Sequence, residues 1–255
     1  MKKALLIPAL LLLACAAFAA PVTLEYRHEG SEVNKYRETN FITQKEDGNT
    51  VSVETITEIT ETVKAPMPDL KLESSVRTVG LKVNGEEQDV SKIPSSSFSY
   101  TLDRLGRVTG SWDKEGKTSS GFDPSKEIGL LPDKPVSKGD TWTGKLIMDT
   151  LNKPITLRLE DVYTKNGVEI ARISFTADYE QGLDDVLGQG AEAAVGELGI
   201  TGKTTIKGSG NIYFSTGLGK VIMLEYTLDR HLMLDGQGQH KEADEREDYK
   251  MWRIE

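Results

Sequence analysis

The side chains that could carry out acid–base or metal chemistry are few and far apart in the sequence. The three histidines, His28, His231 and His240, have no partner at the spacing of a metal-binding motif. We expect all three at the surface: His28 in an Arg-His-Glu run, His231 on the polar face of a strand and His240 in a Gly-Gln loop. This pattern predicts no metal site.

Motifs for covalent or nucleotide chemistry are missing from the sequence. It contains no Gly-x-Ser-x-Gly elbow, no His-Glu-x-x-His, no phosphate-binding loop and no Gly-x-Gly-x-x-Gly. Asp184 and Asp185 are adjacent acids of the kind used in acid–base catalysis, but the start of a helix, where acids are favoured, explains them more simply. We therefore predict a non-enzymatic protein with no catalytic residues and no cofactor.

Arg230 is the one charged residue on an otherwise apolar strand face. Between residues 222 and 234 the even positions are apolar apart from Arg230, and the odd positions are mostly polar, which is typical of a strand with one buried face. Arg230 either binds a carboxylate or phosphate head group inside a cavity or extends from the rim of the sheet into water. The preceding Ser215–Lys220, with Gly217 and Gly219, is the expected turn of a long hairpin.

The N-terminus has the pattern of a signal peptide. Lys2 and Lys3 precede an apolar run that ends in Ala17-Phe18-Ala19, so we expect cleavage after Ala19 and export, with residues 1–19 as the signal and 20–255 as one β-rich domain. The alternative is a lipobox at Leu12-Leu13-Ala14-Cys15, with Cys15 acylated as a lipid anchor. No other cysteine follows, so the folded part can form neither a disulfide nor a thiolate site.

The charge of the chain argues against nucleic acid as a partner. Without Lys2 and Lys3 the chain has 29 basic and 40 acidic residues, a net charge of −11. Nucleic acids and anionic lipid head groups require a basic surface. We expect a soluble exported protein, periplasmic or secreted, with no membrane-spanning segment in the mature chain; the sequence identifies no protein partner.

Alternating apolar and polar residues predict an all-β, mostly antiparallel fold. The expected strands are joined by turns at Asp47-Gly48, Asn84-Gly85 and Asn166-Gly167, which favour tight hairpins. Strands are predicted over the following ranges: 22–26, 35–44, 50–63, 70–82, 155–160, 171–179 and 249–254, the last as an edge strand. We expect loops at Gly110–Gly121 and at the charged run Lys241–Asp248, which is interpreted as a solvated turn.

One turn sequence occurs twice. Tyr100-x4-Leu105-Gly106-Arg107-Val108 has the same spacing as Tyr213-x4-Leu218-Gly219-Lys220-Val221. The repeat indicates either two related halves or the same turn used twice, with a glycine in the left-handed conformation at each corner.

Two motifs resemble those of an uncharacterised family of secreted bacterial β-rich domains. They are Leu131-Pro-Asp-x-Pro-Val-x-x-Gly-Asp-x-Trp142 and the earlier Tyr100-x-Leu-Asp-x-x-Gly-Arg-Val108. The hairpin Tyr213–Leu224 is similar to the C-terminal end of that family, and the likeness covers about Tyr100–Leu234. It implies a β-fold and assigns no catalytic residues. More distantly, the layout resembles the periplasmic lipoprotein-carrier fold, a curved sheet whose concave face holds acyl chains.

The segment Gly182–Gly199 interrupts the strand pattern. Its apolar residues, including Leu187, fall on one helical stripe, but Gly188, Gly190 and Gly196 each disfavour a helix by about 1 kcal/mol. We predict a helix or flap that packs on a large curved sheet or half-barrel; the alternative is a flexible glycine-rich loop.

These observations predict an exported envelope protein that binds an apolar or amphiphilic ligand, such as a lipid, on the concave face of the sheet. The expected lining residues are Leu224, Tyr226, Leu228, Arg230, Phe175 and Leu187. The alternative function is a structural or protein-interaction module of the cell envelope with a solid core and no ligand.

Overall fold

The structure is a computed structural model that is all-β. It describes residues 20–28, 30–68, 70–112, 128–146, 153–182, 201–236 and 239–254. Within these ranges the regular structure consists of strands, without a helix. The expected signal peptide and Cys15 lie outside the described residues. Of the helix or flap expected over Gly182–Gly199, Gly182 is instead the last residue of a strand, and the remainder, with Leu187, also lies outside them.

The strands vary in length from two to 17 residues. Their bounds are β1 Val33–Glu46, β2 Asn49–Ala65, β3 Leu70–Val83, β4 Glu86–Glu87, β5 Ser96–Leu102, β6 Val108–Trp112, β7 Thr141–Gly144, β8 Ile155–Lys165, β9 Val168–Gly182, β10 Thr201–Ser215, β11 Lys220–Gly236 and β12 Gln239–Arg253.

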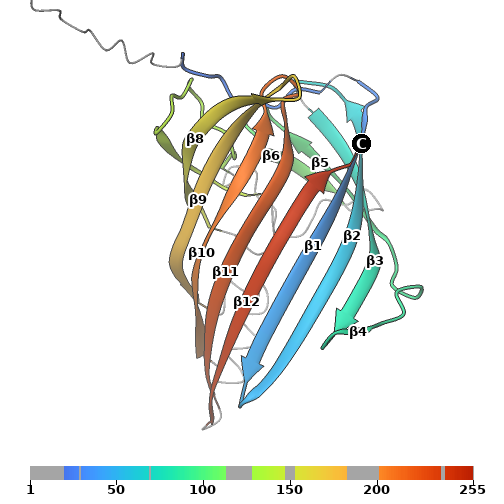
Figure 1. The fold of residues 1–255 in the computed structure, drawn as a ribbon, viewed down its shortest axis with the longest axis vertical. Coiled ribbons are helices and arrows are strands. Elements are labelled where there is room, and N and C mark those ends of the chain that lie inside the picture. The colour runs from blue at the N-terminus through green and yellow to red at the C-terminus, as the bar shows by residue number, and fades with distance from the viewer. Residues whose placement is uncertain are drawn as a thin grey trace, which may run out of the picture.

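All pairings in the sheet are antiparallel, and the sheet is open. The order is β6-β5-β3-β2-β1-β12-β11-β10-β9-β8-β7, with β4 beside β3. The sheet curves so strongly that β5 and β6 lie behind β10 and β11 in Figure 1. The predicted curved antiparallel sheet is therefore confirmed, and its two outermost paired strands are β6 and β7.

The C-terminal part of the chain departs from the prediction. Lys241–Asp248 is not a solvated turn and Tyr249–Ile254 is not an edge strand, because both ranges contribute to β12, in the middle of the sheet between β1 and β11. The charged run is compatible with a strand because its charges alternate in environment: Glu247 is buried, whereas Asp244 and Arg246 face water. The pairing of β12 with β1 joins the two ends of the chain at the centre of the fold.

The predicted hairpin turns are confirmed. Asp47 and Gly48, Asn84 and Gly85, and Asn166 and Gly167 all have positive φ, as the tight turns between twisted strands require. Gly106 and Gly219, the corners of the repeated turn sequence, are also left-handed, with φ of 75° and 62°.

The segment before β1 is mostly not a strand. We expected one over Val22–Tyr26, but only Val22 forms a bridge, with Val136. Tyr26 N–H instead donates to Arg104 O at 2.8 Å, and Arg27 N–H donates to Gly219 O at 2.9 Å. The segment thus fastens onto both repeated turns. The loop expected over Gly110–Gly121 is wrong at its start, because β6 continues to Trp112; the rest of that range lies outside the described residues.

The inner face of the sheet carries two apolar clusters. The larger one includes Leu157, Ile173, Phe214 and Leu228, from β8 to β11, and is covered by Leu24 and by the loop 130–136 that precedes β7. The smaller one consists of Val63, Leu70, Leu72 and Leu102, from β2, β3 and β5. Trp142 connects β7 to the covering loop, because its indole N–H donates to Leu130 O at 2.9 Å.

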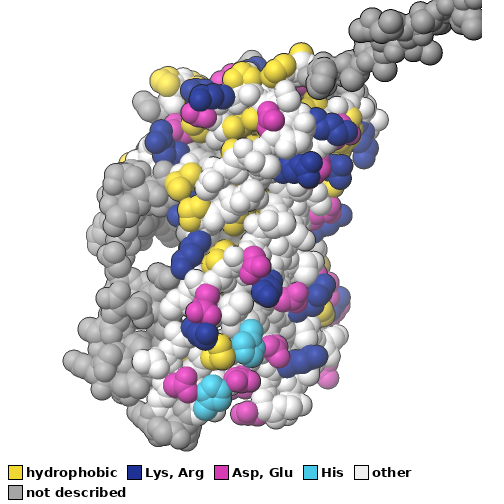
Figure 2. Space-filling view, turned by 90° about the vertical axis from the view of Figure 1, so that its left-hand side faces the viewer, with side chains coloured by type: hydrophobic (Ala, Val, Ile, Leu, Met, Phe, Trp, Pro, Cys, Tyr) yellow, Lys and Arg dark blue, Asp and Glu magenta, His cyan; other side chains and the backbone are white. Residues whose placement is uncertain are grey.

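The outer face is polar. Basic and acidic side chains are interspersed on the face shown in Figure 2. Ion pairs such as Lys203–Glu180 at 2.9 Å and Arg246–Asp229 at 3.4 Å link neighbouring strands; exposed pairs of this kind contribute at most about 1 kcal/mol each. Among the residues described, no helix has the length and apolar character needed to cross a membrane.

Candidate functional site

The candidate site is a cavity of about 740 Å³ on the concave side of the sheet. Leu72 and Leu102 of the smaller cluster line it from one wall, and Ile212 and Leu224 of the larger cluster line it from the other. The curvature of the sheet therefore leaves space between the two clusters instead of merging them into one solid core.

The N-terminal segment and two turns cover one part of the cavity. Tyr26, His28 and Gly106 all contribute to its lining. Gly106 has to be a glycine for two reasons: its φ is positive, and a Cβ on it would lie 2.4 Å from the Tyr26 ring. The close contact holds the Tyr26 ring at the cavity wall.

Three tyrosine–glutamate pairs line the cavity. Tyr100 OH donates to Glu61 Oε1 at 2.5 Å, Tyr249 OH donates to Glu38 Oε2 at 2.7 Å, and Tyr226 OH donates to Glu247 Oε1 at 3.0 Å. The rings of Tyr226 and Tyr249 are stacked, with centroids 4.7 Å apart. The cavity thus presents both apolar surface and a set of aromatic and carboxyl groups in fixed positions.

The environment of Glu61 perturbs its ionisation. Burial raises its pKa, and hydrogen bonds from Tyr100 and Tyr36 together with the charge of Lys220 only partly offset that effect. Glu61 also raises the pKa values of Tyr26, Tyr36 and Tyr100, for each of which burial is the larger cause. Glu61 is therefore a half-buried carboxyl group with three tyrosines near it, and all four residues line the cavity.

A charged cluster lies beside Glu61. Lys220, whose side chain is 3% exposed, donates to Glu32 and, at 3.1 Å, to Asn34 Oδ1. Arg253 lies 3.9 Å from Glu32. Hydrogen bonding and charge from Lys220 lower the pKa of Glu32 in spite of its burial. Lys220 and Glu32 therefore neutralise each other at the edge of the cavity.

His28 belongs to this charged cluster, which corrects the prediction that it lies at the surface. It is buried, because the neighbouring Tyr26 and Arg27 hold the chain against the two repeated turns through their backbone N–H groups. Its Nδ1 lies 3.4 Å from Glu32 Oε2 but has no hydrogen bond to any described residue. Burial and the charge of Lys220 lower the pKa of His28, so the ring is neutral at pH 7. His231 and His240 are at the surface, as predicted, and are paired with exposed acids, but His240 belongs to β12 and not to a loop.

Arg230 is bound within the sheet. Its side chain is 14% exposed and forms ion pairs with Glu245 and Glu247 of the neighbouring β12. Glu247 also accepts a hydrogen bond from Asn40 Nδ2 at 3.0 Å. The two glutamates are the reason that a charged residue is stable on this face, and they explain why the strand pattern could continue past it.

The other predicted lining residues are divided between cavity and core. Leu224 and Tyr226 line the cavity. Phe175 and Leu228 are buried in the larger cluster, and Arg230 is outside the cavity lining.

The sequence analysis did not predict Glu38, Glu61 and the tyrosines around them as lining residues. A signal for Glu61 was present, since it shares a strand face with Ile59 and Val63 at alternate positions.

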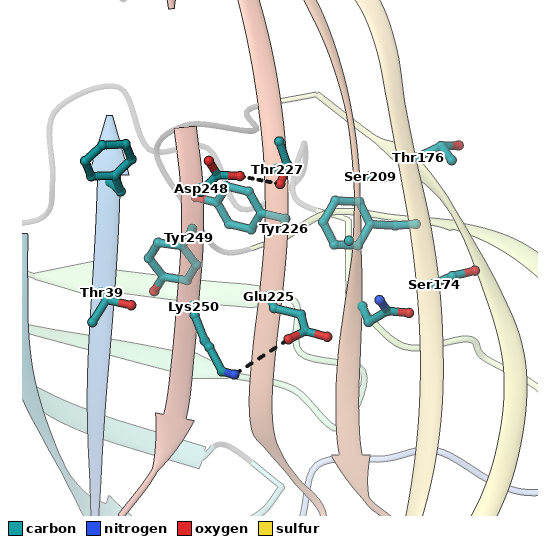
Figure 3. Close-up of a pocket in the computed structure, with 14 residues that line it drawn as sticks. Thr39, Ser174, Thr176, Ser209, Glu225, Tyr226, Thr227, Asp248, Tyr249 and Lys250 are labelled. Atoms are coloured by element: carbon teal, nitrogen blue, oxygen red, sulfur yellow. Dashed lines mark hydrogen bonds and ion pairs between the residues drawn. The ribbon is translucent and has the colours of Figure 1, made fainter. Parts of the chain in front are cut away.

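A second hollow lies on the outer face, over β1 and β9 to β12 (Figure 3). Hydroxyl side chains such as Ser174, Thr176 and Ser209 line it. Thr227 donates to Asp248 at 2.6 Å, and Lys250 lies 3.9 Å from Glu225. This hollow is shallow and its charges are paired across neighbouring strands, so the inner cavity is the better candidate for a ligand.

In the described part of the chain, no group of three or more His, Cys, Asp or Glu side chains is arranged to hold a metal ion. The polar atoms of the cavity are arranged as hydrogen-bonded pairs and one ion cluster, so its chemistry is that of binding a group with both polar and apolar parts.

Comparison with known proteins yields little. The sequence matches no protein-family model, and no curated protein sequence is significantly similar. Among solved structures, the chain is similar to DynF from the dynemicin biosynthesis pathway of Micromonospora chersina, with 9% identity, coverage of 91% of this chain and 86% of that chain, and a TM-score of 0.21. A TM-score this low supports no conclusion about fold or function.

Proposed function

We propose that the protein is an exported, non-enzymatic envelope protein that binds an apolar or amphiphilic ligand on the concave face of its sheet. The observation that carries the proposal is the cavity of about 740 Å³ between the two apolar clusters. Small-molecule sites have volumes of about 300–1,000 Å³ and are mostly apolar with a few well-placed polar groups.

The residues facing the cavity support an amphiphile over a purely apolar ligand. Leu72, Leu102 and Leu224 offer apolar surface, and Glu38 and Glu61 offer carboxyl groups that already accept tyrosine hydrogen bonds. A ligand with a polar end and an apolar chain would satisfy both kinds of wall. Export is supported by the signal-peptide pattern of residues 1–19.

The experiment is binding of a neutral fluorophore, N-phenyl-1-naphthylamine, to the purified protein. A double variant, Val76→Trp with Met251→Trp, places two indoles in the cavity, because both native side chains line it. The control double variant, Ser75→Trp with Lys250→Trp, changes the adjacent positions on the same strands, which are exposed.

We expect the fluorophore to bind the wild type and the control variant, and to bind the cavity variant at least about tenfold more weakly. Equal binding by both double variants would place the fluorophore outside the cavity. No binding to the wild type would favour the structural or protein-interaction module.

A further inference from the structure

The polar groups in the cavity wall also indicate the charge of the ligand, an inference that rests on the proposed function. Three acids line the cavity, and they differ in whether a basic residue already neutralises them. Glu247 is paired with Arg230 and accepts hydrogen bonds from Tyr226 and Asn40. It is therefore satisfied without a ligand.

Glu61 is not neutralised by a basic residue in this way. It accepts a hydrogen bond from the Tyr100 hydroxyl group at 2.5 Å and another from Tyr36, and both are neutral donors. The ammonium group of Lys220, whose charge acts on Glu61, donates its hydrogen bonds to Glu32 and Asn34. A carboxylate has room for about four hydrogen bonds, so two tyrosine donors leave part of the Glu61 carboxylate available to a ligand.

The rings around Glu61 suit a cation. Tyr26, Tyr36 and Tyr100 all line the cavity together with Glu61, and a fourth ring, that of Phe98, stacks on Tyr100 with centroids 5.8 Å apart. Aromatic faces attract organic cations, most strongly where water is excluded, and groups of such rings recognise quaternary ammonium ions. A carboxylate among the rings adds a full negative charge.

An anionic head group fits the same wall less well. Lys220 and Lys145 are the lysines in the lining. Lys220 is neutralised by Glu32, and Lys145 has an interaction of its own. An anion near Lys220 would also be close to the carboxylates of Glu32 and Glu61, whose repulsion opposes its binding.

We propose that the cavity binds an amphiphile whose polar end is an organic ammonium cation, with that cation held by the Glu61 carboxylate and the rings of Tyr26, Tyr36 and Tyr100. The apolar chain of the ligand lies between the two leucine-rich walls. A compound with a positively charged nitrogen and an alkyl tail has the required chemistry.

The test is competition against N-phenyl-1-naphthylamine with decyltrimethylammonium and decyl sulfate, which share a chain length and differ in charge, both below the concentrations at which they form micelles. We expect the ammonium compound to displace the fluorophore from the wild type at an at least about tenfold lower concentration than the sulfate. Glu61→Gln, which keeps the shape of the side chain, is expected to abolish that difference.

The pH dependence of the wild type gives a second measurement that needs no variant. The groups facing Glu61 are Tyr26, Tyr36, Tyr100 and Lys220, with Glu32 and His28 behind them. Burial raises the pKa of Glu61, so decyltrimethylammonium should bind more tightly as pH rises and Glu61 ionises. Decyl sulfate should not gain affinity over the same range.

Equal displacement by the two compounds, or tighter binding of the sulfate, would overturn the assignment of a cation while leaving the proposed cavity function intact. A charge preference that persists in Glu61→Gln would also overturn it. Failure of the fluorophore itself to bind the wild type would reject the proposed function and this inference together.

Discussion

At the scale of single residues, we expect Glu247 and Glu61, two acids of the inner face, to have opposite effects on stability. Glu247 is 1% exposed and is held by Arg230, Tyr226 and Asn40. Glu61 lies in a similar apolar setting and depends on neutral tyrosine donors. The first acid holds β1, β11 and β12 together, whereas the second is an unfavourable charge that the fold retains at its cavity.

Replacing Glu247 with Gln should destabilise the protein by about 2–3 kcal/mol, because the variant leaves Arg230 partly buried with only Glu245 as a charged partner. Urea unfolding would measure the change in the free energy of unfolding. Asp244→Asn on the same strand is the control; its side chain is exposed, so it should change stability by no more than about 0.5 kcal/mol. Equal effects of the two variants would contradict the role given to Glu247.

Replacing Glu61 with Gln should stabilise the protein at pH 7. Burial raises the pKa of Glu61 in the folded state, so its stabilising contribution is complete below the unfolded pKa of about 4.5 and is lost as pH rises through the folded pKa. Glutamine does not ionise, so the variant does not lose stability as pH rises. Its advantage in unfolding temperature should therefore disappear as pH falls toward 4.5.

The exposed Glu73→Gln is the control for this measurement, and it should not alter stability appreciably at either pH. A Glu61→Gln variant that is less stable than the wild type at pH 7 would show that the ionised carboxylate stabilises the fold. A residue that reduces stability in this way is typical of a functional site.

At the scale of elements, the strands and their turns were largely predictable from the sequence. The period-2 patterns and the Asp-Gly and Asn-Gly turns depend on neighbouring residues, so they are local signals. The position of β12 was not predictable, because a run of charges looks solvated until its partners in β1 and β11 are known. The burial of His28 likewise depends on two turns that are distant in sequence.

The turn at Gly106 fixes the N-terminal segment, and a substitution tests this. Gly106→Ala introduces strain at φ 75° and places a Cβ 2.4 Å from the Tyr26 ring. Gly85→Ala has comparable strain, at φ 82°, but meets no atom within 4 Å. Each should lose about 1–2 kcal/mol from its backbone conformation, and Gly106→Ala should lose at least about 1 kcal/mol more. Equal losses in urea unfolding would contradict the packing of Tyr26 on this turn.

At the scale of the whole molecule, the open curved sheet keeps two apolar walls apart around a cavity. The sequence predicted the concave apolar face and two of the lining residues, Leu224 and Tyr226. It did not indicate the opposite wall, since β3 and β5 come into place only through the curvature of the complete sheet.

A ligand between the two walls should stabilise the whole fold. At a free concentration 100 times its Kd, a ligand specific for the native state adds about 2.7 kcal/mol, which corresponds to a rise of about 5–10 °C in Tm for a domain of this size. We expect this rise with N-phenyl-1-naphthylamine for the wild type and for Ser75→Trp with Lys250→Trp. The cavity variant, Val76→Trp with Met251→Trp, should show little change, and an equal rise in all three would contradict binding between the walls.

The most direct test of the account is native mass spectrometry of the protein isolated gently from the cells that make it. The account predicts a retained small molecule that leaves on denaturation, is present on the wild type and the control variant, and is missing from the cavity variant. A ligand-free mass for the wild type, under conditions that keep a known lipid carrier loaded, would contradict it.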